Sequence, residues 1–328
     1  EITNFDWSPD SKWISYSKRA SNDLNQLFIY DLENDKTHEL TDTWYHSSSP
    51  EFSANGKYLY FTSKRSFDPI YSETEWNHAY RDMSKIYLIT LAKETPSPFA
   101  PENDEVNSED KDEEKQEETN VQVDIEGIKD RITVLPVEAS NYGNLSSVDG
   151  KLYYNEKSYS DKHSSLKMFD IESEKEEKLA DKMGFSISDN GKKMLVKKGK
   201  NYAVIDLPSS KIKLDDKLDM SGMEVLVDKR AEWEQIFDES WRQMRDFFYD
   251  PGLHGLDWQS IHDKYKPLVK HARSRHDLNY IIGEMIGELN VGHAYVNGGD
   301  RNKIDKVYTG LLGAEFEKDD SGYFRITN

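Results

Sequence analysis

A short segment that recurs four times in the first two-thirds of the chain constrains its fold more than any other feature. In each copy a polar turn separates two stretches of alternating apolar and polar residues, which is the pattern of a β-hairpin. Three of the turns contain Asn-Gly or Asp-Gly, and glycine tolerates the positive φ that a tight primed turn requires. The copies are residues 5–17, 50–62, 146–154 and 188–196. We therefore expect a series of antiparallel hairpins.

The spacing of these copies predicts β-propeller blades. Ser8 and Ser53 lie 45 residues apart, and Gly150 and Gly191 lie 41 residues apart. Repeats of this length with about four short strands are typical of blades. A further strand is expected after each hairpin, at residues 26–32, 85–91, 165–171 and 202–207. Four blades are the fewest that close a propeller, so we expect more of them upstream of Glu1.

Composition excludes several classes of function. The 328 residues include 43 basic and 62 acidic side chains, a net charge of −19, so nucleic acid is not an expected partner. Acidic residues concentrate near residues 96–120, which we expect to be a disordered insertion within residues 1–227, the propeller region. No apolar run is long enough to span a membrane. The chain contains no cysteine and begins at Glu1, so we expect a piece of a longer protein.

The pattern changes from about Lys211. Residues 212–214 and 223–227 read as the last strands of the propeller region. A helix of about five turns is predicted from near Arg230, and Asp250-Pro251-Gly252 ends it. Its apolar face consists of Trp233, Ile236, Phe237, Trp241, Met244, Phe247 and Phe248.

Two shorter helices follow in a predicted helical domain at residues 228–306. Asp257 is the expected N-cap of the first, with Trp258, Ile261 and Tyr265 facing inward. The second carries Leu278, Ile281, Ile282, Met285, Ile286 and Leu289 on one stripe, and Gly292 is its expected C-cap. Residues 307–328 read as the start of another small β domain, with a hairpin turning at Asp319–Gly322.

His293 is the candidate catalytic residue. It is predicted to follow directly on a helix C-terminus, whose partial negative charge favours a protonated imidazole, and Gly292 beside it leaves room for a substrate. A structural histidine is the competing interpretation. His254, His262, His271 and His276 lack His-Glu-x-x-His spacing, and there is no Gly-x-Ser-x-Gly motif. We expect neither a metal nor a cofactor, and the residues alone do not identify a nucleophile.

Several segments resemble tricorn-type serine peptidases. Residues 227–242 and 247–258 are similar to the entry of the helical catalytic subdomain of that family, and residues 287–295 to its catalytic-histidine segment. Residues 124–131 are similar to a recurrent blade segment, and residues 310–316 to the start of the PDZ domain. The resemblance covers essentially the whole chain and is most specific between Asp228 and Tyr295.

The resemblance implies a multidomain, mainly β fold: propeller blades, a small α-helical subdomain and the first strands of a PDZ-like domain. It implies that His293 is the general base for a serine beyond Asn328, that the substrates are peptides, and that the propeller is a substrate gate. A homo-oligomer in the cytoplasm is expected by the same resemblance. Archaeal members carry a serine immediately before the histidine, where this chain has Gly292.

Three alternatives stay open. A non-catalytic propeller scaffold that binds peptides or partner proteins fits the same blades. A metal-dependent hydrolase would use the histidines and be sensitive to chelators. An exported or periplasmic location stays open because we expect the natural N-terminus to lie upstream of Glu1.

Overall fold

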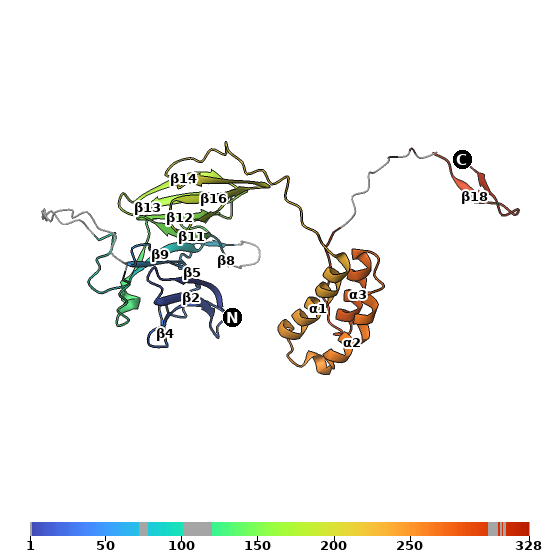
Figure 1. Cartoon of the computed structure of the whole chain (residues 1–328), viewed down its shortest axis with the longest axis horizontal. Coiled ribbons are helices and arrows are strands. Elements are labelled where there is room, and N and C mark those ends of the chain that lie inside the picture. Colours follow the sequence, from blue (N-terminus) through green and yellow to red (C-terminus); the bar gives the residue numbers. More distant parts are fainter. Residues whose placement is uncertain are drawn as a thin grey trace. The chain divides into compact units, whose positions relative to one another are not determined.

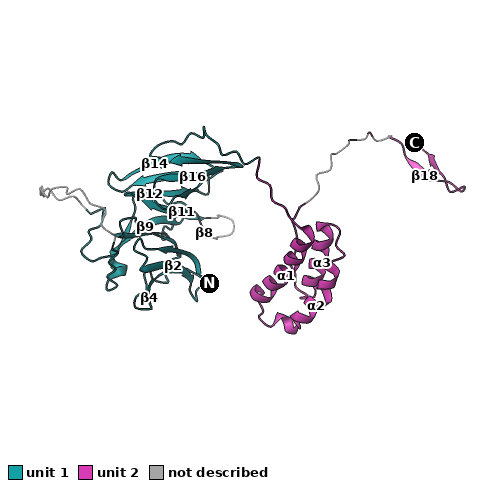
Figure 2. Ribbon diagram, viewed as in Figure 1, with its two compact units in different colours: residues 1–221 teal, residues 222–328 magenta. Residues whose placement is uncertain are grey.

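The computed structural model describes residues 2–71, 78–100, 120–300, 308, 310 and 313–327. It divides into two compact units, Glu1–Ser221 and Gly222–Asn328, which are coloured separately in Figure 2. The boundaries predicted from the sequence, at 227/228 and 306/307, stay predictions.

Among its described residues the first unit contains four antiparallel sheets of three or four strands that follow one another along the chain (Figure 1). The first has the order β1-β2-β3-β4, with β1 (Ile2–Trp7), β2 (Trp13–Arg19), β3 (Asn25–Asp31) and β4 (Lys36–Glu39). The third has the order β11-β12-β13-β14, with β11 (Tyr142–Val148), β12 (Lys151–Glu156), β13 (Ser165–Asp170) and β14 (Lys175–Asp181). The fourth has the order β15-β16-β17, with β15 (Gly184–Ile187), β16 (Lys193–Lys198) and β17 (Asn201–Asp206).

The second sheet is assembled from segments that are distant in sequence. Its order is β10-β9-β6-β5, with β5 (Ser47–Phe52), β6 (Tyr58–Lys64), β9 (Ser84–Thr90) and β10 (Ile132–Val134). A small hairpin, β7 (Pro69–Tyr71) and β8 (His78–Tyr80), is inserted between β6 and β9, and a 3₁₀ turn, Ile128–Arg131, precedes β10. Most of the acidic insertion expected near residues 96–120 lies outside the described residues.

These four sheets confirm the predicted blades, and the recurring serine explains part of the repeat. The Ser53 hydroxyl donates to the Asn55 side chain at 2.7 Å and accepts from the Tyr58 backbone N–H at 2.9 Å. Ser8 and Ser188 make the matching pairs of bonds in their own turns. A side chain that pairs with nearby backbone in this way stabilises a turn against other conformations.

The primed turn predicted for the three copies with Asn-Gly or Asp-Gly is present in one of them. Asp149 and Gly150 both have positive φ, 46° and 72°, as a two-residue primed turn requires. In the other three copies the hairpin closes over a longer loop, and a single residue near its end is left-handed: Ser11, Gly56 or Gly191. In each of these copies the serine hydroxyl accepts a backbone N–H from the far end of the loop, and this hydrogen bond stabilises the loop without a primed turn.

Acidic side chains link the edge strands of successive blades. The Asp6 carboxylate on β1 accepts the Phe52 N–H of β5 at 2.7 Å. The Glu51 carboxyl group on β5 accepts the Ser147 N–H of β11 at 2.9 Å. Both carboxyl groups are largely withdrawn from water. Burial, and after it the nearby charge of Asp6, raises the pKa of Glu51 to about 8, and burial also raises the pKa of Asp6.

From the raised pKa of Glu51 beside Asp6 we predict that the first unit loses stability as pH rises. Between the ordinary pKa of 4.5 and about 8, the folded state holds a proton on Glu51 that the unfolded state has released. Over that interval the free energy of unfolding falls by up to about 1.4 kcal/mol per pH unit. We expect Glu51→Gln to flatten this fall in calorimetric melting curves, whereas the exposed Glu33→Gln leaves it unchanged. An equally steep fall in Glu51→Gln would contradict the assignment.

Two strands expected at the end of the propeller region are not formed. Residues 212–214 and 223–227 carry no ladder pairing, although the Ile212 N–H does donate to the Leu179 carbonyl at 2.9 Å. Val225 and Leu226 are almost fully exposed. An alternating apolar pattern forms a strand only if a neighbouring strand pairs with its backbone over several residues, and among the described residues these segments have no such ladder.

The second unit begins with three helices: α1 (Lys229–Phe247), α2 (Trp258–Val269) and α3 (Arg275–Gly287). Their N-termini are capped by Asp228, Asp257 and Ser274, whose side chains accept backbone N–H groups. Asp257 was the predicted cap. Between α1 and α2 lies a 3₁₀ turn, Leu253–Gly255.

The three helices enclose one apolar core. Phe237, Leu278, Met285 and Leu289 are fully buried in it. The indole N–H of Trp241 donates to the Trp258 carbonyl at 2.8 Å, and the indole N–H of Trp258 donates to the Trp241 carbonyl at 3.0 Å. Phe247 was predicted on the buried face of α1 but is 78% exposed, because α1 ends at that residue.

The last described segment is a two-stranded hairpin, β18 (Phe316–Lys318) and β19 (Phe324–Ile326). The Asp319 carboxylate accepts the backbone N–H of Ser321 at 2.9 Å in its turn. The predicted hairpin is therefore present, and its assignment to a PDZ-like domain stays a prediction.

Candidate active site

The segment that carries His293 leaves α3 through a left-handed asparagine. The backbone N–H groups of Leu289 and Asn290 still bond to Ile286 and Gly287, at 3.1 and 3.0 Å. Asn290 then has φ 48°, while Gly292 has no positive φ. The expected C-cap at Gly292 is therefore wrong. Asparagine is one of the few residues other than glycine that tolerate this conformation, so it ends the helix earlier.

His293 itself has φ 62° and is exposed. Its ring lies edge-on to that of Tyr295, with centroids 6.4 Å apart. Because α3 ends at Gly287, His293 is not directly behind the helix as predicted, and the partial charge of a helix end is confined to its last turn. A left-handed histidine is uncommon, and such conformations cluster at functional sites.

A hollow of about 580 Å³ lies beside His293. One side is the segment from Leu289 to Ala294. The other is the end of α1 and the residues after it, including Met244, Phe247, Phe248 and Tyr249. The exposed Phe247 is thus part of a wall of this hollow. Its size and largely apolar lining suit a side chain or short segment of a ligand.

The arrangement presents an accessible imidazole next to an apolar surface. Among the described residues, no serine hydroxyl is hydrogen-bonded to His293, so the site contains a candidate base without a nucleophile beside it. The sequence placed His293 in a loop after the helix, and its neighbours from α1 were not anticipated. They come from a part of the chain about 45 residues away, and periodicity cannot show that two such segments meet.

His262 has a structural environment. Its ring nitrogens lie 3.0 Å from the Asp238 carboxylate and 3.1 Å from that of Asp263. Lys266 also donates to both oxygens of Asp238. Burial opposes ionisation of Asp238, but the bonds from Lys266 and His262 outweigh it and lower the pKa of Asp238. This cluster joins α1 to α2.

His254 is the residue that sequence reasoning underestimated. Its Nδ1 atom lies 2.9 Å from the carbonyl oxygen of Leu289, at the base of the His293 segment, and its Nε2 atom is hydrogen-bonded to the Tyr249 hydroxyl. The signal that could have found it is the Asp250-Pro251-Gly252 turn that brings it there.

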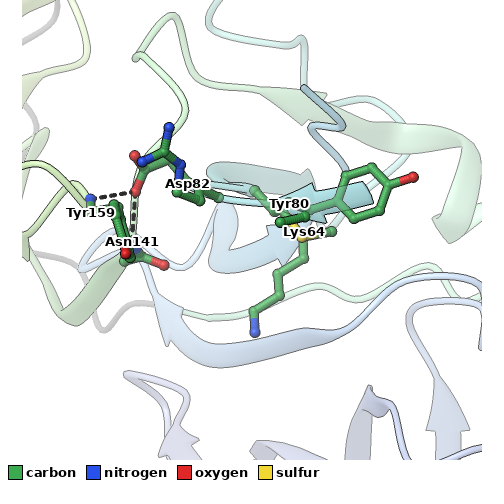
Figure 3. Close-up of a pocket in the computed structure, with 8 residues that line it drawn as sticks. Lys64, Tyr80, Asp82, Asn141 and Tyr159 are labelled. Carbon is green, nitrogen blue, oxygen red and sulfur yellow. Dashed lines mark hydrogen bonds between the residues drawn. The ribbon is translucent and has the colours of Figure 1, made fainter. Parts of the chain in front are cut away.

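A second hollow, of about 400 Å³, lies on the first unit beside Lys64 and the residues around Tyr80 (Figure 3). The Asp82 carboxylate accepts from the Asn141 side chain and the Tyr159 N–H, each at 2.8 Å, as the dashed lines show. It also accepts from the Ser158 hydroxyl at 2.8 Å. These bonds join the second blade to the third, so we assign Asp82 a structural role.

Comparison with known families gives one match within each unit. Residues 1–208 match the family "Tricorn protease second beta propeller domain", and residues 229–287 match "Tricorn protease C1 domain". The chain belongs to the tricorn protease family. The C1 match ends at Gly287 and so does not include His293.

Individual tricorn relatives align with nearly the whole chain. "Tricorn protease homolog 1" of Streptomyces coelicolor is 32% identical over 98% of the chain, and "Tricorn protease" of Thermoplasma acidophilum is 26% identical over 98%. The solved "Crystal structure of the tricorn protease" covers 97% of the chain with a TM-score of 0.75 at 22% identity, which shows a shared fold. The chain spans about a third of the length of these tricorn proteins. Among the described residues no helix is long and apolar enough to cross a membrane.

Proposed function

We propose that this chain is part of a serine peptidase in which His293 is the general base. The observation that carries the proposal is an exposed, left-handed histidine at the edge of the 580 Å³ hollow. Membership of the tricorn protease family and the names of its relatives support peptide hydrolysis by the whole protein. We place the nucleophilic serine, its acidic partner and the oxyanion donors beyond Asn328.

In this mechanism an unprotonated ring nitrogen of His293 accepts the proton of the serine hydroxyl as its oxygen attacks the peptide carbonyl carbon. The protonated imidazole then gives that proton to the leaving amine. An accessible ring is required, because both the serine and the leaving group must reach it. Gly292 offers no side chain there, so any assistance that a preceding serine gives in archaeal relatives is absent or comes from elsewhere.

We also propose roles for the propeller blades and for the β18–β19 hairpin. The propeller blades are a gate for peptides that approach the site, and the β18–β19 hairpin begins a PDZ-like, peptide-handling domain. A homo-oligomer and a cytoplasmic location are proposed from the family alone.

A covalent test separates this proposal from its alternatives. In the natural protein that contains this chain, an organophosphorus reagent that phosphorylates activated serines is expected to abolish peptide hydrolysis, with one label per site. A chelator is expected to leave the activity unchanged, because His293 needs no metal in this role. Chelator sensitivity without labelling would favour a metal-dependent hydrolase. Peptide binding with neither hydrolysis nor labelling would favour a scaffold.

A further inference from the structure

His254 lies in a backbone turn of unusual conformation. Leu253, His254 and Gly255 have φ values of 49°, 55° and 80°, three left-handed residues in succession. Two of them carry side chains, for which this region is unfavourable. The Asp250 carboxylate supports the turn by accepting the N–H groups of Gly252 at 3.0 Å and of His254 at 2.8 Å. The turn therefore holds the imidazole in one place.

Both nitrogens of the His254 ring are used. A carbonyl oxygen can only accept a hydrogen bond, so Nδ1 carries a proton and donates it to the Leu289 oxygen. In the neutral ring Nε2 then has no proton and accepts from the Tyr249 hydroxyl. His254 is consequently committed to these two partners and is not a second free base.

These two partners belong to the two walls of the hollow beside His293. Tyr249 lies on the wall that follows α1, and the ring of Phe248 on that wall is also 5.1 Å from the His254 ring. Leu289 is fully buried and begins the segment that carries His293. The His254 imidazole is therefore hydrogen-bonded to both walls, to Leu289 on one and to Tyr249 on the other.

We propose that His254 is a positioning residue that fixes the segment from Leu289 to His293 against the end of α1, and so orients the His293 ring. The proposal rests on the proposed function of His293. Only three residues separate Leu289 from His293. Asn290, the first of them, and His293 itself are left-handed. A displacement of the Leu289 carbonyl therefore reaches the His293 imidazole over a short length of backbone. Misplacement of a catalytic group by about 1 Å lowers rates by roughly 10²-fold.

The kinetic experiment compares His254→Ala, His254→Asn and Tyr249→Phe in the natural protein that contains this chain. We expect His254→Ala to lower kcat by about 10- to 100-fold, with KM changed by less than about threefold. His254→Asn is expected to recover most of kcat, because its amide can donate in place of Nδ1 and asparagine tolerates a left-handed backbone. Tyr249→Phe is expected to have a smaller effect, since it keeps the bond to Leu289.

A second measurement needs no catalysis. In the 328-residue chain, nitrogen-correlated NMR of the histidine rings is expected to show His254 with its proton on Nδ1. His254→Ala should shift the His293 ring signals, whereas His271→Ala, at an exposed histidine after α2, should not. Unchanged His293 signals, or kcat within twofold of the wild type in His254→Ala, would overturn the proposal. Failure of His254→Asn to restore kcat at an unchanged melting temperature would also overturn it.

The two proposals can fail separately. If the NMR result is as expected but His293→Ala hydrolyses peptides normally, the orienting role of His254 stands and the catalytic role of His293 does not. If His293→Ala is inactive but His254→Ala is normal, only the positioning role is wrong.

Discussion

His293→Ala is expected to lower kcat/KM for peptide hydrolysis by the natural protein by three orders of magnitude or more. Loss of the base leaves the serine without a proton acceptor as it attacks, and without a donor for the leaving amine. Removal of a triad member in serine proteases has effects of about 10⁴- to 10⁶-fold, and binding and oxyanion contacts sustain the remainder. The measurement is steady-state hydrolysis of a fluorogenic oligopeptide.

Two controls make the His293 result specific. His271→Ala replaces an exposed histidine of the same unit and is expected to retain full activity. The melting temperature of His293→Ala should match the wild type within a few degrees, because the side chain is exposed and has no hydrogen-bond partner among the described residues. Full activity in His293→Ala would contradict the catalytic assignment of His293 and would favour the interpretation of this chain as a non-catalytic scaffold.

Trp258→Ala is expected to destabilise the helical part of the second unit by about 3–5 kcal/mol. The side chain is 4% exposed and fills the core between α1 and α2. Its loss leaves a large cavity and removes one of the two indole bonds that join these helices, at 3.0 Å to the Trp241 carbonyl. Urea unfolding followed by circular dichroism at 222 nm measures this directly, since the α-helices among the described residues all lie in this unit.

Matched variants separate the contributions of packing and hydrogen bonding to the stability lost in Trp258→Ala. Trp258→Phe keeps an aromatic ring but cannot donate to Trp241, so a smaller loss of about 1–3 kcal/mol is expected. Tyr280→Ala, at an exposed position on α3, should change stability by less than about 0.5 kcal/mol. A loss below about 1 kcal/mol in Trp258→Ala would mean that the helices are not held together by this contact.

The second unit, Gly222–Asn328, shows both where sequence reasoning succeeded and where it failed. Apolar periodicity predicted each of the three helices, and Asp257 was found as a cap because capping depends on neighbours within one turn. Periodicity failed at Phe247 and at the apolar residues of segment 223–227, which are exposed. Hydrophobicity indicates that a side chain gains by burial, but it does not specify which partner covers it.

The same limit applies at the candidate site. His293 could be singled out from its sequence context and from a family resemblance. Its φ of 62°, the hollow beside it and the wall formed by Phe248 and Tyr249 could not. Gly292 was a reasonable cap by composition, yet Asn290 adopted the left-handed conformation because the last helical hydrogen bonds end there.

The sequence by itself determined features that depend on near neighbours: the blade repeat, the three helices with the Asp257 cap, and a histidine that follows the third helix. Only the tertiary structure decided the features that join distant segments. Asp6 meets Phe52, Glu51 meets Ser147, and His254 reaches the carbonyl of Leu289. The reason is physical, because backbone conformation and side-chain periodicity are local properties. A hydrogen bond between residues far apart exists only after the intervening chain has folded and closed the loop between them.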